Sequence, residues 1–160
     1  MRKPRSDRPF LTNPGAFGEN IATSGLTENE AAIGDVFRLG NALVEISQGR
    51  QPCWKLNERF SEKTMARKVQ ETGRTGWYYR VLEAGTVSPG DRLSLLERHS
   101  PNWTIARIWR TFYVNTLDRS ELAAIAALTR LVSGWRSHTA RCLESGEVED
   151  WSKRLQGGEG

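Results

Sequence analysis

The hydrophobic period of this chain changes near residue 100, and no other feature of the sequence constrains its fold as strongly. Before that point, apolar residues occur in short runs separated by turn residues, as in β-strands. Beyond it, Ile105, Ile108, Trp109 and Phe112 recur at positions i, i+3, i+4 and i+7, which is the spacing of one helix face. The sequence therefore predicts a β-rich part followed by a helical part, with the boundary at residues 99–103.

The β-rich part is expected to span residues 17–98, after an irregular lead-in at residues 1–16. Two apolar runs, at residues 36–39 and 43–46, flank the pair Gly40-Asn41. Glycine accepts a positive φ at no steric cost, so a Gly-first pair between two strands is suited to a tight turn. These residues predict a β-hairpin.

Two further strands and one helix complete this part. Strands are expected at residues 77–82, which are rich in aromatic residues, and around residues 93–95. A helix is expected at residues 62–71, with Ser61 as its N-cap and Gly73 ending it.

The helical part is expected to hold three helices within residues 103–155. The second begins after Asp118, whose side chain can cap the helix, with Glu121 favourable in the first turn. Its apolar face is expected to continue as far as Leu131. The third follows Gly134 and spans residues 135–143.

The charge of the chain lies mostly in its first residues. Lys and Arg number 23 and Asp and Glu 19, so the formal net charge is +4. Residues 1–9 hold four basic residues and one acidic residue, which leaves a net charge of +1 for the rest. A nucleic-acid-binding domain usually gathers its basic residues on a folded face. Nucleic-acid polymers are therefore not expected as partners.

The sequence contains no membrane or export signal. No apolar run reaches the roughly 18 residues of a membrane span. The basic start leads into no apolar signal-peptide region. We therefore expect a cytoplasmic protein.

Cys53 is the best single candidate for a reactive side chain. It follows a strand, precedes a short predicted helix and has Arg50 and Lys55 as neighbours. A helix N-terminus and cationic neighbours both favour the thiolate, which is the nucleophile and the ligand for soft metals. The alternative is that Cys53 is a small buried apolar residue, as many free cysteines are. Cys142 has no comparable neighbours and is interpreted as structural.

Two glycine-containing segments could contribute further polar groups. The first holds Gly18, Glu19 and Asn20, and the second spans residues 72–78 and includes Arg74, which could hold a phosphate. Each has an alternative interpretation as a simple turn, because glycine-rich turns are common and neither segment matches a known phosphate loop. The two histidines lie in different parts of the chain, which argues against a zinc site or a histidine-based triad.

Four segments of the sequence together resemble the MOSC domain, named after the C-terminal domain of molybdenum cofactor sulfurases. They are FGENI at residues 17–21, GL at 25–26, IGDVFR at 33–38 and SQGRQPCWKL at 47–56. The segment TGRTGWYYR and the residues after it resemble the end of that domain. The helical part resembles the three-helix extension of a bacterial stand-alone branch that detoxifies N-hydroxylated purine bases.

The resemblance implies a mainly-β, barrel-like fold of the pyruvate-kinase-barrel type and a molybdenum cofactor. It implies Cys53 as metal ligand and catalytic residue. It also implies cofactor contacts from the residues that share these motifs, namely Gly18, Glu19, Asn20, Ser47, Arg50, Lys55 and Arg74. The expected reaction is reduction of N-hydroxylaminopurines and similar small molecules, with electrons from a separate flavoprotein. Pyridoxal phosphate binding is a further association of this family.

The sequence departs from the family pattern in two places. Gly49 stands where the family usually has proline. The upstream strands, with a His-Gly-Gly motif that helps to form the cofactor pocket, are absent, and the match starts at residue 17. Three alternatives follow: an enzyme completed by the missing part or by a second copy of the chain, a sulfur carrier that holds a persulfide on Cys53, and a truncated non-catalytic remnant.

Overall fold

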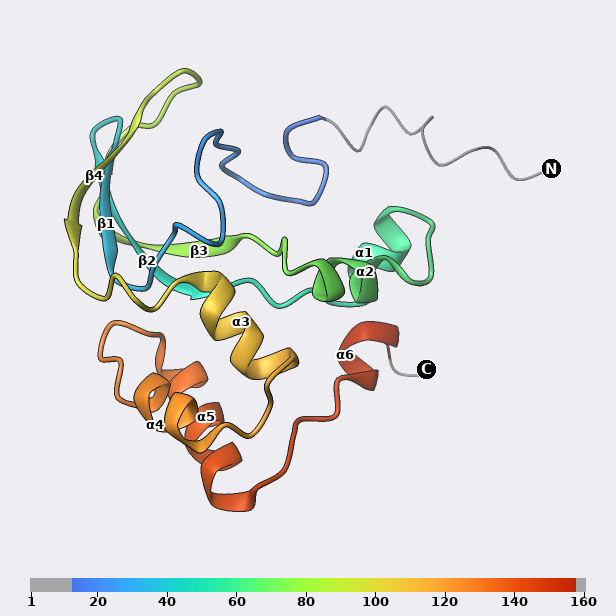
Figure 1. Ribbon diagram of the computed structural model, residues 1–160. Coiled ribbons are helices and arrows are strands. Elements are labelled where there is room, and N and C mark those ends of the chain that lie inside the picture. Colours follow the sequence, from blue (N-terminus) through green and yellow to red (C-terminus); the bar gives the residue numbers. More distant parts are fainter. Residues whose placement is uncertain (1–12, 158–160) are drawn as a thin grey trace.

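The computed structural model of the protein describes residues 13–157 and is built on one four-stranded antiparallel sheet (Figure 1). The strand order is β3-β2-β1-β4, so β3 and β4 are the two edge strands. The strands are β1 (Asp35–Leu39), β2 (Ala42–Gly49), β3 (Trp77–Glu83) and β4 (Leu93–Arg98).

The helices form two groups around this sheet. Figure 1 shows α3, α4 and α5 together on one side of the sheet, while α1, α2 and α6 gather beyond the end of β2 and β3. Their bounds are α1 (Lys55–Arg59), α2 (Met65–Thr72), α3 (Ile105–Tyr113), α4 (Arg119–Ala126), α5 (Ser133–Ser145) and α6 (Ser152–Gln156). The predicted class, a mainly-β part followed by helices, is confirmed.

The predicted hairpin is present between β1 and β2. Leu39 pairs with Ala42, and Gly40 has a φ of +55°, in the left-handed region that glycine tolerates. The backbone N–H of Asn41 donates to the carbonyl of Thr86 at 3.0 Å, which fastens the turn to the loop after β3. The strands expected at residues 77–82 and 93–95 are also confirmed.

Two predicted helix boundaries were wrong. The helix before β3 begins at Met65 rather than at residue 62, and Ser61 is not its N-cap. Ser61 has a φ of +47°, whereas an N-cap residue has an extended backbone. Helix α4 has the predicted Asp118 cap, with the carboxylate accepting from the N–H groups of Ser120 and Glu121, but it ends at Ala126. Leu131 is buried in the turns after it.

The third helical segment also differs from expectation. Gly134 lies inside the first turn of α5 instead of before it. Helix α6 was not predicted at all. The irregular lead-in expected at residues 1–16 lies for the most part outside the described residues.

The main hydrophobic core is shared by the sheet and the C-terminal helices. Phe37 and Ile46 from the strands pack in one buried cluster with Ile108, Ile125 and Leu131. A smaller cluster joins α1, α2 and α6, with Leu56, Phe60, Ala66 and Leu155 buried in it. The core therefore runs across the point where the hydrophobic period changes.

Asp35, in the IGDVFR segment, links the two strands β1 and β4. Its side chain is fully buried and accepts from the N–H of Ala32 at 3.0 Å. Arg98 donates to both carboxylate oxygens, from Nε at 2.9 Å and from Nη2 at 2.7 Å. A two-point bond of this kind is geometrically specific. Asp35 therefore has a structural function in this fold.

The edge strands carry exposed apolar side chains. Tyr78, Val81 and Leu82 on β3 and Leu95 and Leu96 on β4 are all at least 43% exposed. Edge strands with unpaired backbone groups and apolar side chains favour association. Within residues 13–157, no helix has the length and apolar character that crossing a membrane requires.

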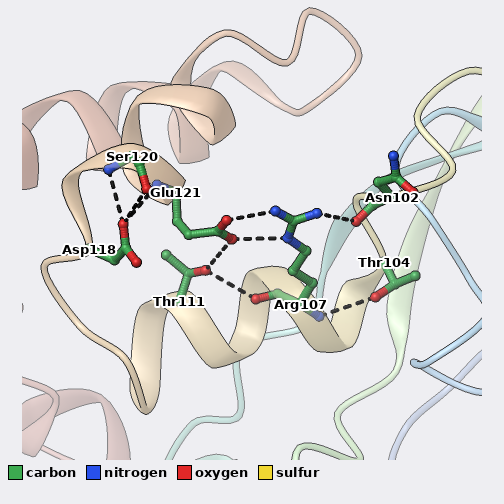
Figure 2. A network of polar contacts seen from close by, with 7 residues as sticks. All are labelled: Asn102, Thr104, Arg107, Thr111, Asp118, Ser120 and Glu121. Carbon is green, nitrogen blue, oxygen red and sulfur yellow. Dashed lines mark hydrogen bonds and ion pairs between the residues drawn. The ribbon is translucent and has the colours of Figure 1, made fainter.

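Figure 2 shows the polar network that joins α3 to α4. Arg107 donates from Nε to Glu121 at 3.0 Å and from Nη2 at 2.6 Å, and its Nη1 donates to the carbonyl of Asn102 at 3.0 Å. Thr111 donates to Glu121 at 3.4 Å. The Arg107 guanidinium is the main cause that lowers the pKa of Glu121 from its usual 4.5.

The Glu121→Gln substitution tests the contribution of this network to stability. Because the pKa of Glu121 is lower in the folded state, its stabilising effect is present above pH 4.5 and is lost as the pH falls through the folded pKa. The Arg107 side chain is 40% exposed, so solvent screening limits the loss at pH 7 to about 1 kcal/mol. Urea unfolding at pH 7 and at acidic pH should show a difference from wild type only at pH 7.

Glu144→Gln, an exposed change on α5, is the control and should leave stability unchanged at both pH values. An equal loss for Glu121→Gln at neutral and acidic pH would contradict the assigned role of the Arg107–Glu121 pair.

Candidate functional site

Cys53 lies in the loop at residues 50–54, which joins the end of β2 to the start of α1. The loop begins after Gly49, the last residue of β2, and Trp54 occupies the N-cap position of α1. The Cys53 thiol is free and partly exposed. The structure thus places Cys53 just before a helix, as predicted, but α1 has only five residues, so the helix dipole at this position is small.

The segment with Gly18, Glu19 and Asn20 forms a tight turn. The Glu19 carboxylate accepts from the N–H of Gly15 at 2.7 Å and from that of Phe17 at 2.9 Å. Burial opposes ionisation of Glu19, but these backbone bonds and the charge of Arg50 outweigh it, and the pKa of Glu19 is lowered. Gly18 has a φ of +81°, and Asn20 is exposed.

This turn is attached to α1, the helix that follows the Cys53 loop. Arg59 donates to the carbonyls of Ala16 at 2.5 Å and Gly15 at 2.9 Å. The rings of Phe17 and Phe60 lie 4.8 Å apart. The charge of Arg50 contributes to the lowered pKa of Glu19.

The turn that contains Arg74 borders the Cys53 loop. Gly73 ends α2 with a φ of +69°, so the predicted helix stop is confirmed. The carbonyl of Gly76 accepts from the N–H of Arg50 at 2.9 Å, which fixes the turn beside the loop. Arg74 itself is exposed.

Ser47 and Lys55, the other predicted site residues, lie before and after the Cys53 loop. Ser47 is on β2 and only 8% exposed, and its hydroxyl donates to the carbonyl of Tyr78 at 3.4 Å. Its hydroxyl is therefore directed to the neighbouring strand. Lys55 is exposed in the first turn of α1.

The structure adds a group of residues that the sequence analysis missed. Arg154, in α6, bonds to the backbone of Pro52 and Trp54 on either side of Cys53. Gln51 donates to the Tyr113 hydroxyl at 2.9 Å, and burial is the main cause that raises the pKa of that hydroxyl. Helix α6 has only five residues, too few to show a periodic pattern in the sequence. The contact of Arg154 with the Cys53 loop is therefore seen only in the folded structure.

A groove of about 500 Å³ lies between α2, α3 and the segment that leads into α6. Its walls include Trp109, Tyr113 and Trp151, together with Gln70 and Leu155. This volume is in the range of small-molecule sites. Through Tyr113, the groove is linked by a hydrogen bond to Gln51, two residues before Cys53.

Cys142 lies on α5, outside the Cys53 loop and beside His138. The Sγ atom of Cys142 and Nε2 of His138 are 3.7 Å apart. Burial raises the pKa of the Cys142 thiol and lowers that of the His138 imidazole, so both groups favour their neutral forms. Among the described residues, no three His, Cys, Asp or Glu side chains form a group that could hold a metal ion.

Comparison with known families identifies the chain. Residues 3–94 match the model of the MOSC domain, and residues 103–146 match the model of the YiiM-like 3-alpha helix domain. The first match covers more than half of the chain, so the protein belongs to the MOSC domain family, with YiiM-like helices after the MOSC domain.

Individual relatives agree with this assignment. The uncharacterized protein YflK of Bacillus subtilis is 45% identical over 131 residues, which are 80% of this chain and 59% of YflK. YiiM of Escherichia coli is 37% identical over 142 residues, 89% of this chain and 63% of YiiM. The crystal structure of E. coli YiiM superposes with a TM-score of 0.87 and 37% identity over 92% of this chain and 73% of that one.

A third relative is named for an activity. A protein of Gibberella moniliformis named "Reductase" is 38% identical over 121 residues, which are 75% of this chain and 22% of that protein. The chain therefore spans about three fifths of YflK and YiiM and a smaller share of the reductase.

Proposed function

We propose that this chain is part of a molybdenum-cofactor oxidoreductase that reduces N-hydroxylated compounds such as N-hydroxylaminopurines. The observation that carries the proposal is the loop at residues 50–54, which presents a free, partly exposed Cys53 thiol within a MOSC domain. The relationship to a protein named as a reductase supports the reaction class.

The donor groups around the loop are compatible with a molybdenum–pterin group. A cysteine thiolate is a soft ligand of the kind that such metals take. Cations and amides suit the cofactor's phosphate, and the Cys53 loop, α1 and the neighbouring segment supply Arg50, Lys55 and Arg74. Among the described residues, the side chains of Lys55 and Arg74 form no hydrogen bond or ion pair, so both are available to an anion.

In this proposal the bound cofactor supplies the two-electron chemistry, and the protein orients it. The hydroxylamino group accepts two electrons and two protons, the N–O bond breaks, and an amine and water are formed. A separate flavoprotein donates the electrons. Cys53 would hold the metal of a bound cofactor, and Arg50 and Arg74 would hold its anionic group.

The expected partners and cellular location belong to the same proposal. The substrate is a small molecule rather than a nucleic-acid polymer, and the two free cysteines suit the reducing cytoplasm. The apolar side chains on the edge strands β3 and β4 support self-association of copies. Pyridoxal phosphate binding is not part of the proposal.

Molybdenum content tests the role of Cys53. The chain is expressed with a supply of cofactor, and metal per chain is measured for wild type and for Cys53→Ser. We expect the variant to lose most of its molybdenum, because the substitution removes the soft ligand. Cys142→Ser is the matched control and should keep the wild-type content, since Cys142 lies beside His138 rather than in the Cys53 loop.

Equal molybdenum in wild type and Cys53→Ser would overturn the assignment of Cys53. A wild-type protein without molybdenum would overturn the proposal as a whole and favour a non-catalytic MOSC remnant. Sulfide released from molybdenum-free protein by a reductant, and lost in Cys53→Ser, would instead favour the second candidate, sulfur transfer through a Cys53 persulfide.

A further inference from the structure

Both peptide groups of Cys53 are bonded to a single residue from the far end of the chain. Nη1 of Arg154 donates to the carbonyl of Pro52 at 2.5 Å, and the carbonyl of Arg154 accepts from the N–H of Trp54 at 2.7 Å. The Pro52 carbonyl belongs to the peptide before Cys53 and the Trp54 N–H to the peptide after it. Arg154 therefore restrains both peptide planes that set the direction of the Cys53 side chain.

Arg154 is itself held in place by partners on two other helices. Its Nη2 donates to the side-chain carbonyl of Gln70, on α2, at 2.9 Å. The guanidinium carbon lies 5.6 Å from the centre of the Tyr113 ring, on α3. Nη2 also lies 3.4 Å from the Tyr113 hydroxyl, which accepts the bond from Gln51. The restraint on the loop thus depends on packed side chains and not on the end of α6 alone.

Leu155, the residue after Arg154, also fixes α6 to the region around α1. Leu155 is 6% exposed and packs with Leu56 and Phe60 of the smaller core cluster. The carbonyl of Leu155 accepts from the side-chain amide of Asn57 at 2.7 Å, and the other end of that amide accepts from the N–H of Ala66 at 2.8 Å. Helix α6 is therefore an integral part of the structure around α1.

Arg154 lies outside both family matches, although the loop that it contacts lies inside the first. The MOSC model ends at residue 94 and the YiiM-like helix model at residue 146, whereas α6 begins at Ser152. Resting on the proposed role of Cys53, we propose that Arg154 is a positioning residue that sets the orientation, and so the reactivity, of the Cys53 thiol. Helix α6 is the element that carries it to the loop.

The test compares the two cysteines of the same molecule and needs no cofactor. Alkylation rates of Cys53 and Cys142 with iodoacetamide are followed by mass spectrometry in wild type, Arg154→Met, Arg154→Lys and Lys153→Met. Arg154→Met keeps an apolar side chain of similar length but removes the bonds to Pro52 and Gln70. Lys153→Met removes the neighbouring charge from an exposed position on the same helix.

We expect Arg154→Met to change the ratio of the Cys53 rate to the Cys142 rate by about threefold or more, because access to a thiol governs its reaction rate. The ratio in Arg154→Lys should lie between wild type and Arg154→Met, since lysine can still donate to the Pro52 carbonyl. Lys153→Met should keep the wild-type ratio. Amide hydrogen exchange at Trp54 should be faster in Arg154→Met alone, because local opening frees that N–H.

An unchanged ratio in a folded Arg154→Met protein would overturn the proposal. This includes the case in which both alkylation rates rise by the same factor, which would indicate general loosening of the structure. In the cofactor-loaded protein, Arg154→Met should also lower molybdenum affinity about 10–100-fold, as loss of an outer-shell partner does at metal sites. If molybdenum is absent from wild type while the alkylation ratio changes as expected, the proposed function fails and the role of Arg154 stands.

Discussion

The Glu45→Gln variant is expected to unfold at a much lower denaturant concentration than the wild-type protein. The Glu45 side chain is only 1% exposed, and its Oε1 accepts from Nη1 of Arg80 at 3.1 Å. Its other oxygen, Oε2, accepts from Arg130. Glutamine places an N–H₂ donor against one of these two guanidinium donors and removes the charge that both arginines face. Breaking a buried ion pair from one side costs about 3–5 kcal/mol.

The expected loss for Glu45→Gln is about 2–4 kcal/mol, because Arg80 and Arg130 are 45% and 39% exposed and can turn toward water. Urea unfolding of wild type and variant measures it. Glu97→Gln is the matched control on β4, where the glutamate is 62% exposed and bonded to His99. The control should stay within about 0.5 kcal/mol of wild type. A similar loss in both variants would contradict the special position of Glu45.

A second set of variants separates the contribution of the Glu45 charge from that of its volume. Replacing Glu45, Arg80 and Arg130 together by methionine removes all three charges and puts apolar side chains of similar length in their places. Replacing a buried ionic group as a whole is often close to neutral. We expect this triple variant to be more stable than Glu45→Gln, because it leaves no arginine without its carboxylate partner. The opposite order would show that the ion pairs themselves stabilise the fold relative to apolar side chains.

The Gly85→Ala variant is expected to destabilise the protein by about 3 kcal/mol, at the upper end of the cost of overpacking. A Cβ atom at Gly85 would lie 2.4 Å from the carbonyl carbon of Asn41 and 2.5 Å from the nitrogen of Ala42. Both atoms belong to the backbone of the β1–β2 hairpin, so no side-chain rotation relieves the contact. The hairpin or the loop after β3 must move, and thermal unfolding should show a clearly lower Tm.

The same substitution at Gly134 is the control and should act in the opposite direction. Gly134 lies in the first turn of α5, and a Cβ there meets no heavy atom within 4 Å. Alanine at a compatible helical position stabilises by about 0.4–1 kcal/mol, because it restricts the unfolded chain. If both variants lowered the Tm, or neither did, the close approach at Gly85 would not be the cause.

Local features of the sequence predicted the elements that depend on local physics. Gly40 predicted the hairpin because the turn requires a positive φ. Asp118 predicted the start of α4 because a carboxylate satisfies the free N–H groups of a first turn. The end of α4 was missed, because Leu131 is buried by tertiary packing after the helix has stopped and so mimics its apolar face. The N-cap predicted at Ser61 was wrong, because Ser61 has a φ of +47° in the loop before α2.

The candidate site was predictable only in part. Cys53, Arg50 and Arg74 were proposed from motifs, and the structure fixes the segment of Arg74 beside the Cys53 loop through the bond from Arg50 to Gly76. Arg154 was not found, because residues about 100 positions apart share no local pattern and α6 is too short for a hydrophobic period. Its contact with the loop follows from the burial of Leu155, which is a property of the folded chain.

By itself, the sequence determined the order of β-rich and helical parts, the hairpin, the Asp118 cap, the helix stop at Gly73 and the motif that contains Cys53. These depend on backbone preferences and side-chain spacing over a few residues. Only the tertiary structure decided that Glu45 is buried between Arg80 and Arg130 and that Arg154 restrains both peptides of Cys53. Strand alternation says nothing about a partner that arrives from a distant segment, because such contacts are set by how the elements pack to bury their apolar surface.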